Sequence, residues 1–164
     1  MLIAVISDTH KNSRSIDIAK KHIKETNAEI IIHLGDCIED VEPLKEEFNG
    51  EVYAVEGNCD SLNKYPKEGI LEVNGKKIYF THGDLYGVKH GLDNLRCRGK
   101  EVGADIVLFG HTHEPFKEEK NGIILMNPGS IAKPVLRDRA IGFIEIDDEG
   151  NLIRSELKLV KLYG

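Results

Sequence analysis

Five apolar runs of this sequence are each followed by side chains that can bind a metal ion. The motifs are Asp8-Thr9-His10, Gly35-Asp36, Gly57-Asn58, His82-Gly83-Asp84 and Gly110-His111-Thr112-His113. Imidazole and carboxylate groups together suit Mn, Fe, Zn, Co or Ni better than Ca or Mg. Any one of the motifs could be a simple turn or a surface loop. Their repetition after successive strands predicts one shared metal site.

The number of candidate ligands indicates two ions rather than one. The candidates are Asp8, His10, Asp36, Asn58, His82, His111 and His113. A carboxylate has two oxygens and can bridge two ions, and hydrolytic two-metal sites hold their ions about 3.5–4 Å apart. We therefore expect two divalent ions, with manganese favoured and nickel, cobalt, iron or zinc as alternatives.

The first half of the chain predicts strands and helices that could bring these residues together. Buried strands are expected at 2–7, 29–34 and 51–55, with helices after residue 12 and over 41–48. This alternation is typical of parallel β-α-β units. Ligands of open α/β sheets bind beyond the carboxyl ends of the strands, which is where the first three motifs stand.

The second half predicts hairpins. Asn74-Gly75 between two short apolar strands is a strong signal for a two-residue type I′ turn. A helix over 91–102 and a strand over 105–109 follow. The expected hairpins span 70–80, 115–126 and 141–159. The simplest arrangement is one mixed α/β domain, 1–164, with two sheets.

Composition excludes several classes of protein. A net charge of −6 argues against nucleic acid as a main partner. No apolar stretch is long enough to cross a bilayer, and no basic leader precedes the first apolar run, so we expect a cytoplasmic protein without a membrane partner. Three cysteines without a C-x-x-C pair argue against a disulfide framework and a thiolate zinc site.

Taken in order, the five motifs resemble the signature of the calcineurin-like metallophosphoesterases, and the resemblance covers nearly the whole chain. Gly57-Asn58-Cys59-Asp60 and Asn127-Pro128-Gly129-Ser130 resemble the small single-domain bacterial and archaeal phosphodiesterase branch. The retromer scaffold subunit of eukaryotes belongs to that branch too. The resemblance implies an α/β fold, a four-layer α/β/β/α sandwich with two mixed β-sheets (the metallo-dependent phosphatase fold), and metals at one edge of the sheets.

The resemblance also implies a role for each candidate ligand. The first metal would be held by Asp8, His10 and His113, and the second by Asn58, His82 and His111. Asp36 would bridge the two ions. Asp36, Asn58 and His111 would act directly in catalysis.

The implied activity is hydrolysis of a small phosphate diester by a hydroxide that bridges the two metals. Two divalent ions bring about +4, the carboxylates of Asp8 and Asp36 about −2, and the hydroxide about −1, which leaves a surplus suited to a diester monoanion. The alternatives are a non-catalytic, retromer-like scaffold, and a phosphomonoesterase or nucleotide pyrophosphohydrolase. The complete ligand set favours an enzyme over a scaffold. A homodimer is left open.

One residue departs from the pattern. Cys59 stands where many relatives have a histidine that interacts with the phosphate or the leaving group. We read it as a small buried residue. Without an imidazole acid, activated diesters with good leaving groups are the favoured substrates.

Other residues near the motifs keep two interpretations. Asp60 could orient a ligand or cap a turn, and Ser130 could contact phosphate or end a loop. His33 is read as a core histidine. A basic cluster could capture an anion or be ordinary charged surface; its members are Lys133, Arg137 and Arg139.

Overall fold

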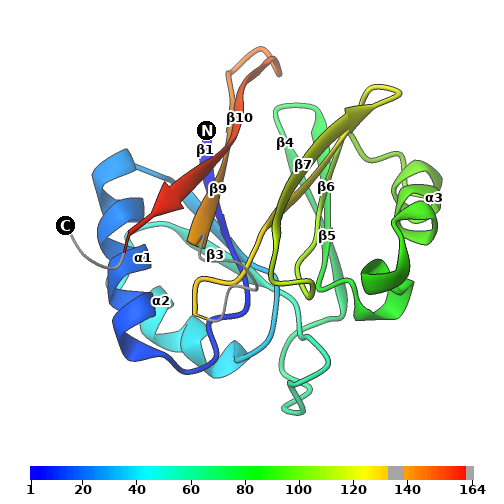
Figure 1. The fold of residues 1–164 in the computed structure, drawn as a ribbon. Helices are drawn as coiled ribbons and strands as arrows, with labels where there is room; N and C mark the ends of the chain where they lie inside the picture. The colour runs from blue at the N-terminus through cyan, green and yellow to red at the C-terminus, as the bar shows by residue number, and fades with distance from the viewer. Residues whose placement is uncertain (133–138, 162–164) are drawn as a thin grey trace.

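Two five-stranded sheets face each other, and helices cover the outer surface of each (Figure 1). The computed structural model describes residues 1–132 and 139–161. Helices α1 and α2 lie against the first sheet, and α3 lies against the second. The layers follow one another as helix, sheet, sheet and helix, so the predicted four-layer α/β/β/α sandwich is confirmed.

The first sheet has the strand order β10-β9-β1-β2-β3. Its strands are β1 (Leu2–Ile6), β2 (Ile30–His33), β3 (Glu51–Ala54), β9 (Arg139–Ile146) and β10 (Leu152–Val160). The pairs β1–β2 and β2–β3 are parallel, as the β-α-β pattern predicts, while β9 and β10 are antiparallel additions. Because β1, β2 and β3 run in one direction, the loops that follow them emerge at the same edge.

The second sheet has the order β4-β5-β6-β8-β7. Its strands are β4 (Glu68–Val73), β5 (Lys76–Thr81), β6 (Ile106–Leu108), β7 (Pro115–Lys120) and β8 (Ile123–Pro128). The central strands β5, β6 and β8 are parallel, and β4 and β7 pair antiparallel at the two sides. Asn74 and Gly75 have φ angles of 49° and 86°, as a type I′ turn requires. The predicted hairpin is therefore confirmed.

The helices begin and end where local chemistry allows. Helix α1 (Ser13–Thr26) is capped by Asn12, whose side chain accepts a hydrogen bond from the Ser15 amide. Helix α2 (Val41–Glu47) follows the short 3-10 turn η1 (Ile38–Asp40). Helix α3 (Asp93–Glu101) begins later than predicted, because two 3-10 turns, η2 (Asp84–Tyr86) and η3 (Val88–His90), and Gly91, whose φ of 139° is not helical, come first.

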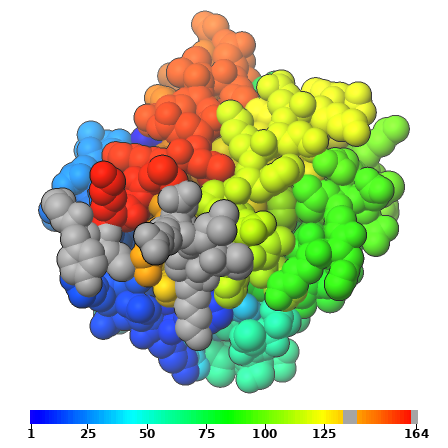
Figure 2. Space-filling view, in the orientation of Figure 1, coloured from blue at the N-terminus to red at the C-terminus, as the bar shows by residue number. Residues whose placement is uncertain are grey.

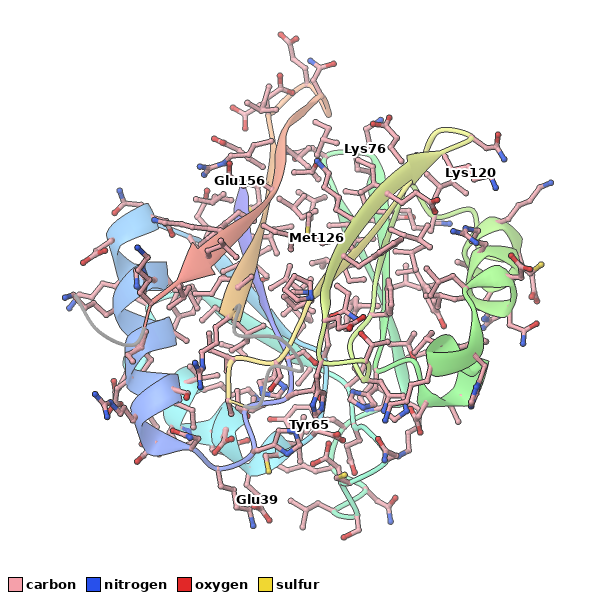
Figure 3. The ribbon with its side chains drawn as sticks, in the orientation of Figure 1. Glu39, Tyr65, Lys76, Lys120, Met126 and Glu156 are labelled. Atoms are coloured by element: carbon pink, nitrogen blue, oxygen red, sulfur yellow. The ribbon has the colours of Figure 1, made fainter. Side chains whose placement is uncertain are left out.

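Alternating side chains of β1 divide the apolar core into layers. Ile3 and Val5 pack between the two sheets, together with Met126, which Figure 3 labels in that space. Leu2, Ala4 and Ile6 face the opposite way and pack against α1. Successive residues of a strand point to opposite faces, so one strand anchors both layers and fixes the edge at which its loop emerges.

Strands β10 and β7 lie next to each other along one face, which Figure 2 shows as the contact between the red and yellow surfaces. The Lys117 ammonium donates a hydrogen bond to the Ser155 carbonyl across this contact. Within residues 1–132 and 139–161, no helix is long and apolar enough to cross a membrane.

Candidate metal centre

The structure brings the seven predicted ligands to one edge of the sandwich. They follow β1, β2, β3, β5 and β6, and they meet at the end of the molecule where Figure 3 labels Glu39 and Tyr65. Two groups of ligand atoms form there, each with all of its atoms within 4.8 Å of one another. The first group is Asp8, His10, Asp36 and His113, and the second is Asp36, His82 and His111.

The first group converges on one oxygen of Asp8. The His113 Nε2 lies 3.1 Å from Asp8 Oδ1, and the His10 Nε2 lies 3.8 Å from the same oxygen. The two imidazole nitrogens are 3.4 Å apart. The second Asp8 oxygen accepts hydrogen bonds from the Ser7 hydroxyl at 2.5 Å and the His111 amide at 3.3 Å. Oδ1 is therefore the oxygen turned toward the histidines.

The second group converges on the Nε2 atom of His82. Asn58 Oδ1 lies 3.1 Å from this nitrogen, His111 Nδ1 lies 3.2 Å away and Asp36 Oδ2 lies 3.4 Å away. The other ring nitrogen, Nδ1, is 2.7 Å from the Leu34 carbonyl oxygen. A carbonyl can only accept, so Nδ1 carries the proton and Nε2 of the neutral ring presents a lone pair.

These two groups fit two divalent cations. In each, imidazole nitrogens and carboxylate or amide oxygens lie within a few ångströms of one another, an arrangement that a cation would stabilise. Asp36 belongs to both groups, as a bridging ligand must. The Leu34 carbonyl orients His82 in the way that backbone groups commonly orient metal-binding histidines.

The electrostatics keep Asp36 and His111 in forms that can bind a metal, whereas they favour a proton on His82. Burial raises the pKa of Asp36, but the hydrogen bond and charge of His82 and the Cys59 amide outweigh burial and hold that pKa far below its usual value. Burial, with the charges of His82 and Lys89, lowers the pKa of His111. Burial also lowers the pKa of His82, but the Asp36 hydrogen bond and the charges of Asp8 and Asp36 raise it by more. A bound cation would compete with that proton.

Most of the candidate ligands have an unusual backbone conformation. Five of them have φ between 49° and 70°, in the left-handed region: Asp8, His10, Asp36, His111 and His113. For residues other than glycine this conformation is costly and persists only where the surroundings impose it. The sequence contains no local signal for it.

Asp60 holds two of the ligand loops together. Its carboxylate accepts hydrogen bonds at 2.8–2.9 Å from four backbone amides, which belong to Gly57, Asp36, Cys37 and Ile38. Of the two interpretations of Asp60, the structure supports a role in holding the loop of Asp36 against the loop of Asn58.

Two of the glycines in the motifs are required by close packing. A Cβ at Gly57 would collide with the Asp36 carboxylate and would lie 2.9 Å from the His82 ring. A Cβ at Gly110 would collide with Ser7 and would lie 3.1 Å from Asp8 Oδ2. Both glycines precede a candidate ligand, so the absence of a side chain lets the loops approach.

The interpretation of Cys59 as a buried residue is wrong. Cys59 is exposed, because the short loop after β3 turns outward at Asn58 and only the Cys59 amide is drawn inward, donating to Asp36 Oδ1 at 3.1 Å. The thiol therefore lies at the open side of the candidate site. Sequence reasoning could not tell which part of the residue would face Asp36.

The other residues with two interpretations have structural contacts wherever the structure describes them. Ser130 is buried, and its hydroxyl donates to the Asp8 carbonyl at 2.8 Å. His33 is fully buried, as predicted. Arg139 donates to the Ile131 carbonyl. Lys133 and Arg137 lie outside the described residues.

A cavity lies away from the ligands. It has a volume of about 680 Å³ and is lined by residues that include Ile23, Ile30, Leu44 and Phe48. None of the seven candidate ligands lines it. The chemistry-bearing groups lie instead at a rim where Asn58 is exposed and His10, His111 and His113 are half-buried.

Comparison with known proteins gives a consistent result. The model of the calcineurin-like phosphoesterase superfamily domain matches residues 1–149. "Probable metallophosphoesterase MJ0623" of Methanocaldococcus jannaschii is 40% identical over 152 residues, which cover 91% of this chain and 78% of that protein. "Phosphodiesterase MJ0936" of the same organism is 28% identical, over 90% of this chain and 94% of its own. The crystal structure of Entamoeba histolytica Vps29 with zinc has the same fold, with a TM-score of 0.78 at 23% identity over 99% of each chain.

Proposed function

Because the chain belongs to the calcineurin-like phosphoesterase superfamily, we propose that it is a divalent-metal-dependent phosphodiesterase acting on small phosphate diesters. One observation carries the proposal: seven side chains form two groups of metal-binding atoms that share Asp36. The similarity to a named phosphodiesterase over 90% of this chain supports the same substrate class.

Each ligand has a role in this proposal. Asp8, His10 and His113 hold one ion, Asn58, His82 and His111 hold the other, and Asp36 bridges them. Manganese is the first candidate, with nickel, cobalt, iron or zinc as alternatives. Two divalent cations bound there would lower the pKa of a shared water toward neutrality, making it the hydroxide that attacks phosphorus, and would stabilise the charge on the phosphate oxygens.

The protein prepares this site by fixing which atom of each ligand faces the ions. Ser7 and the His111 amide occupy one oxygen of Asp8, which leaves the other for a metal. The Leu34 carbonyl holds the proton of His82 on Nδ1, which leaves Nε2 as the ligand. Only Asp8 and Asp36 contribute negative charge to the two groups, and Asn58 adds a neutral oxygen. The positive charge that remains favours a substrate anion.

Cys59 favours diesters with good leaving groups over monoesters. Partial burial and the neighbouring Asp36 carboxylate raise the pKa of its thiol. A thiol is a weaker acid than an imidazolium, so Cys59 is a poor general acid for an alkoxide leaving group. Activated leaving groups need little acid assistance, so aryl diesters are the substrates to examine first.

The proposal is tested by removing and restoring the metal. Protein treated with a chelator should hydrolyse bis(p-nitrophenyl) phosphate only after a metal is added back, with Mn, Ni, Co, Zn and Mg each tried separately. The monoester p-nitrophenyl phosphate should react more slowly. Asp36→Asn should lower diester turnover at least about 100-fold while the circular dichroism spectrum stays unchanged, because one lost charge weakens both ions. Asp17→Asn, an exposed change on α1, is the matched control.

Three outcomes would contradict the proposal in different ways. A folded protein without turnover on either substrate, with any metal, would favour a non-catalytic scaffold. Faster hydrolysis of the monoester would favour a phosphomonoesterase. Wild-type turnover by Asp36→Asn would remove the bridging role of Asp36.

A further inference from the structure

Three buried polar side chains form a connected group behind the candidate metal site. Thr9, His33 and Asp40 are at most 8% exposed. The Thr9 hydroxyl lies 3.1 Å from His33 Nε2 and 2.5 Å from Asp40 Oδ2. None of the three belongs to the groups of metal-binding atoms, so the proposed reaction leaves their burial unexplained.

The direction of every hydrogen bond in this group is fixed by the Gly35 amide at one end and the Asp40 carboxylate at the other. The Gly35 amide can only donate, and it donates to His33 Nδ1 at 3.1 Å. Burial lowers the pKa of His33 to about 4, so the ring is neutral and carries its proton on Nε2. Nε2 therefore donates to the Thr9 hydroxyl, and the hydroxyl donates to the Asp40 carboxylate. The Thr9 hydroxyl thus links the His33 ring to the Asp40 carboxylate.

The group is attached to both loops that carry the aspartate ligands. Thr9 lies between Asp8 and His10, and the Asp40 carboxylate also accepts the Lys11 amide at 3.1 Å. At the other end, Gly35 directly precedes Asp36. The Asp8 amide donates to the Gly35 carbonyl at 3.0 Å and joins the same two loops along the backbone.

The loop of Asp8 needs such support because of its backbone. Asp8, His10 and Lys11 have φ angles of 54°, 49° and 55°, three left-handed residues within four positions. A non-glycine residue keeps this conformation only when its surroundings impose it. Within this loop, Thr9 and Lys11 both direct a hydrogen-bond donor to the same Asp40 oxygen.

We infer that Thr9, His33 and Asp40 are positioning residues for the metal site. They hold the strained Asp8–Lys11 loop at a fixed distance from the Asp36 loop, so that Asp8, His10 and Asp36 are arranged for the first ion before it binds. This inference rests on the metal site of the proposed function. It differs from a purely structural role because it predicts that disrupting the group lowers the affinity for the metal.

The decisive variant is Thr9→Val, which removes the hydroxyl at nearly constant volume. Manganese binding to the chelator-treated protein is measured by isothermal titration and by electron paramagnetic resonance of free manganese, at a temperature where all variants are folded. Thr9→Val should lower the affinity for the ion held by Asp8 and His10 about 10- to 100-fold, which is the range measured when outer partners of metal sites are lost. Thr9→Ser restores the hydroxyl and should bind manganese within a few-fold of wild type.

The matched control is Thr81→Val. Thr81 is also buried and directly precedes a candidate ligand, but its hydroxyl donates to the Lys67 carbonyl and not to a ligand loop. It should lose stability and keep its manganese affinity. If Thr9→Val does not fold, Asp40→Asn serves instead, since it keeps the side-chain shape and one acceptor oxygen. Asp40→Asn should also lower the affinity for manganese.

The outcomes separate this inference from the proposed function. Wild-type protein that binds no manganese would refute the metal site itself. Wild-type protein that binds manganese, with Thr9→Val or Asp40→Asn binding equally well, would overturn only the positioning role. Equal losses of affinity in Thr9→Val and Thr81→Val would also overturn it, because the effect would then follow general stability.

Discussion

At both ends of the sandwich the backbone contains residues with left-handed φ angles, but the residue types differ between the two ends. At the end where Figure 3 labels Lys76 and Lys120, the bends fall on Asn74-Gly75 and Asn121-Gly122. These are residue types that tolerate positive φ without help. At the opposite end the bends include the candidate ligands Asp8, His10, Asp36, His111 and His113, together with Lys11 and Cys37.

The difference shows where each end obtains its stability. The hairpin turns leave room for a side chain, since a Cβ at Gly75 or Gly122 would contact nothing within 4 Å, and the long-range hydrogen bond of the Asn74 side chain goes to the Asp147 carbonyl of a neighbouring hairpin. The ligand loops depend on carboxylates from elsewhere in the chain, Asp40 and Asp60, and on glycines packed against other ligands. Disturbing the ligand end should therefore change metal binding and activity, whereas disturbing the hairpin end should change stability alone.

The largest contrast is expected between Gly57→Ala and Gly75→Ala. At Gly57 the new Cβ must displace the Asp36 carboxylate and the His82 ring, and a shift near 1 Å can cost about 100-fold in rate. Gly75→Ala meets no neighbour, and its φ of 86° should cost about 1 kcal/mol of unfolding free energy. Diester turnover with manganese and urea unfolding measure the two effects. Equal activity of the two variants would refute the distinction between the ends.

A smaller contrast is expected between two aspartates that accept backbone amides. Asp60→Ala leaves four amide donors of the ligand loops without their acceptor, and should reduce the unfolding free energy by about 3 kcal/mol and manganese affinity about 10-fold or more. Asp147→Ala removes the acceptor for the Glu149 and Asn151 amides in an exposed hairpin. Its manganese affinity, measured by titration, should equal that of wild type. An equal loss in both variants would show that Asp60 has no particular connection to the metal site.

The smallest expected effect is a loss of stability in acid that arises from a histidine at the ligand end. His33 is neutral in the folded protein with a pKa of about 4, whereas an unfolded histidine has a pKa of about 6.5. Between these values the unfolded state binds more protons, so the unfolding free energy should fall by about 2 kcal/mol as the pH decreases from about 6.5 to about 4.

The pH effect can be isolated with two variants measured in the presence of a chelator. His33→Gln should show a shallower decrease than wild type, while His90→Gln, a change in an exposed loop, should keep the wild-type slope. If His33→Gln shows the same slope as wild type, His33 is not the group that makes the folded state sensitive to acid over this range.

Much of the fold could be predicted because it follows from local pattern. Apolar runs with intervening helices predicted the parallel strands β1, β2 and β3, and Asn-Gly pairs predicted two of the hairpins. The order of the five motifs along the chain gave the candidate ligands, and the rule that loops meet at the carboxyl ends of parallel strands gave their common edge.

Tertiary structure decided how those residues are held. The carboxylate of Asp60 reaches the amide of Asp36 from 24 residues away, and His113 meets Asp8 across 105 residues. Left-handed φ angles at the ligands, the exposure of Cys59 and the group of Thr9, His33 and Asp40 all depend on such distant contacts. Local propensity cannot encode them, because the free energy that offsets a strained loop becomes available only once the strands have paired and brought the loops together.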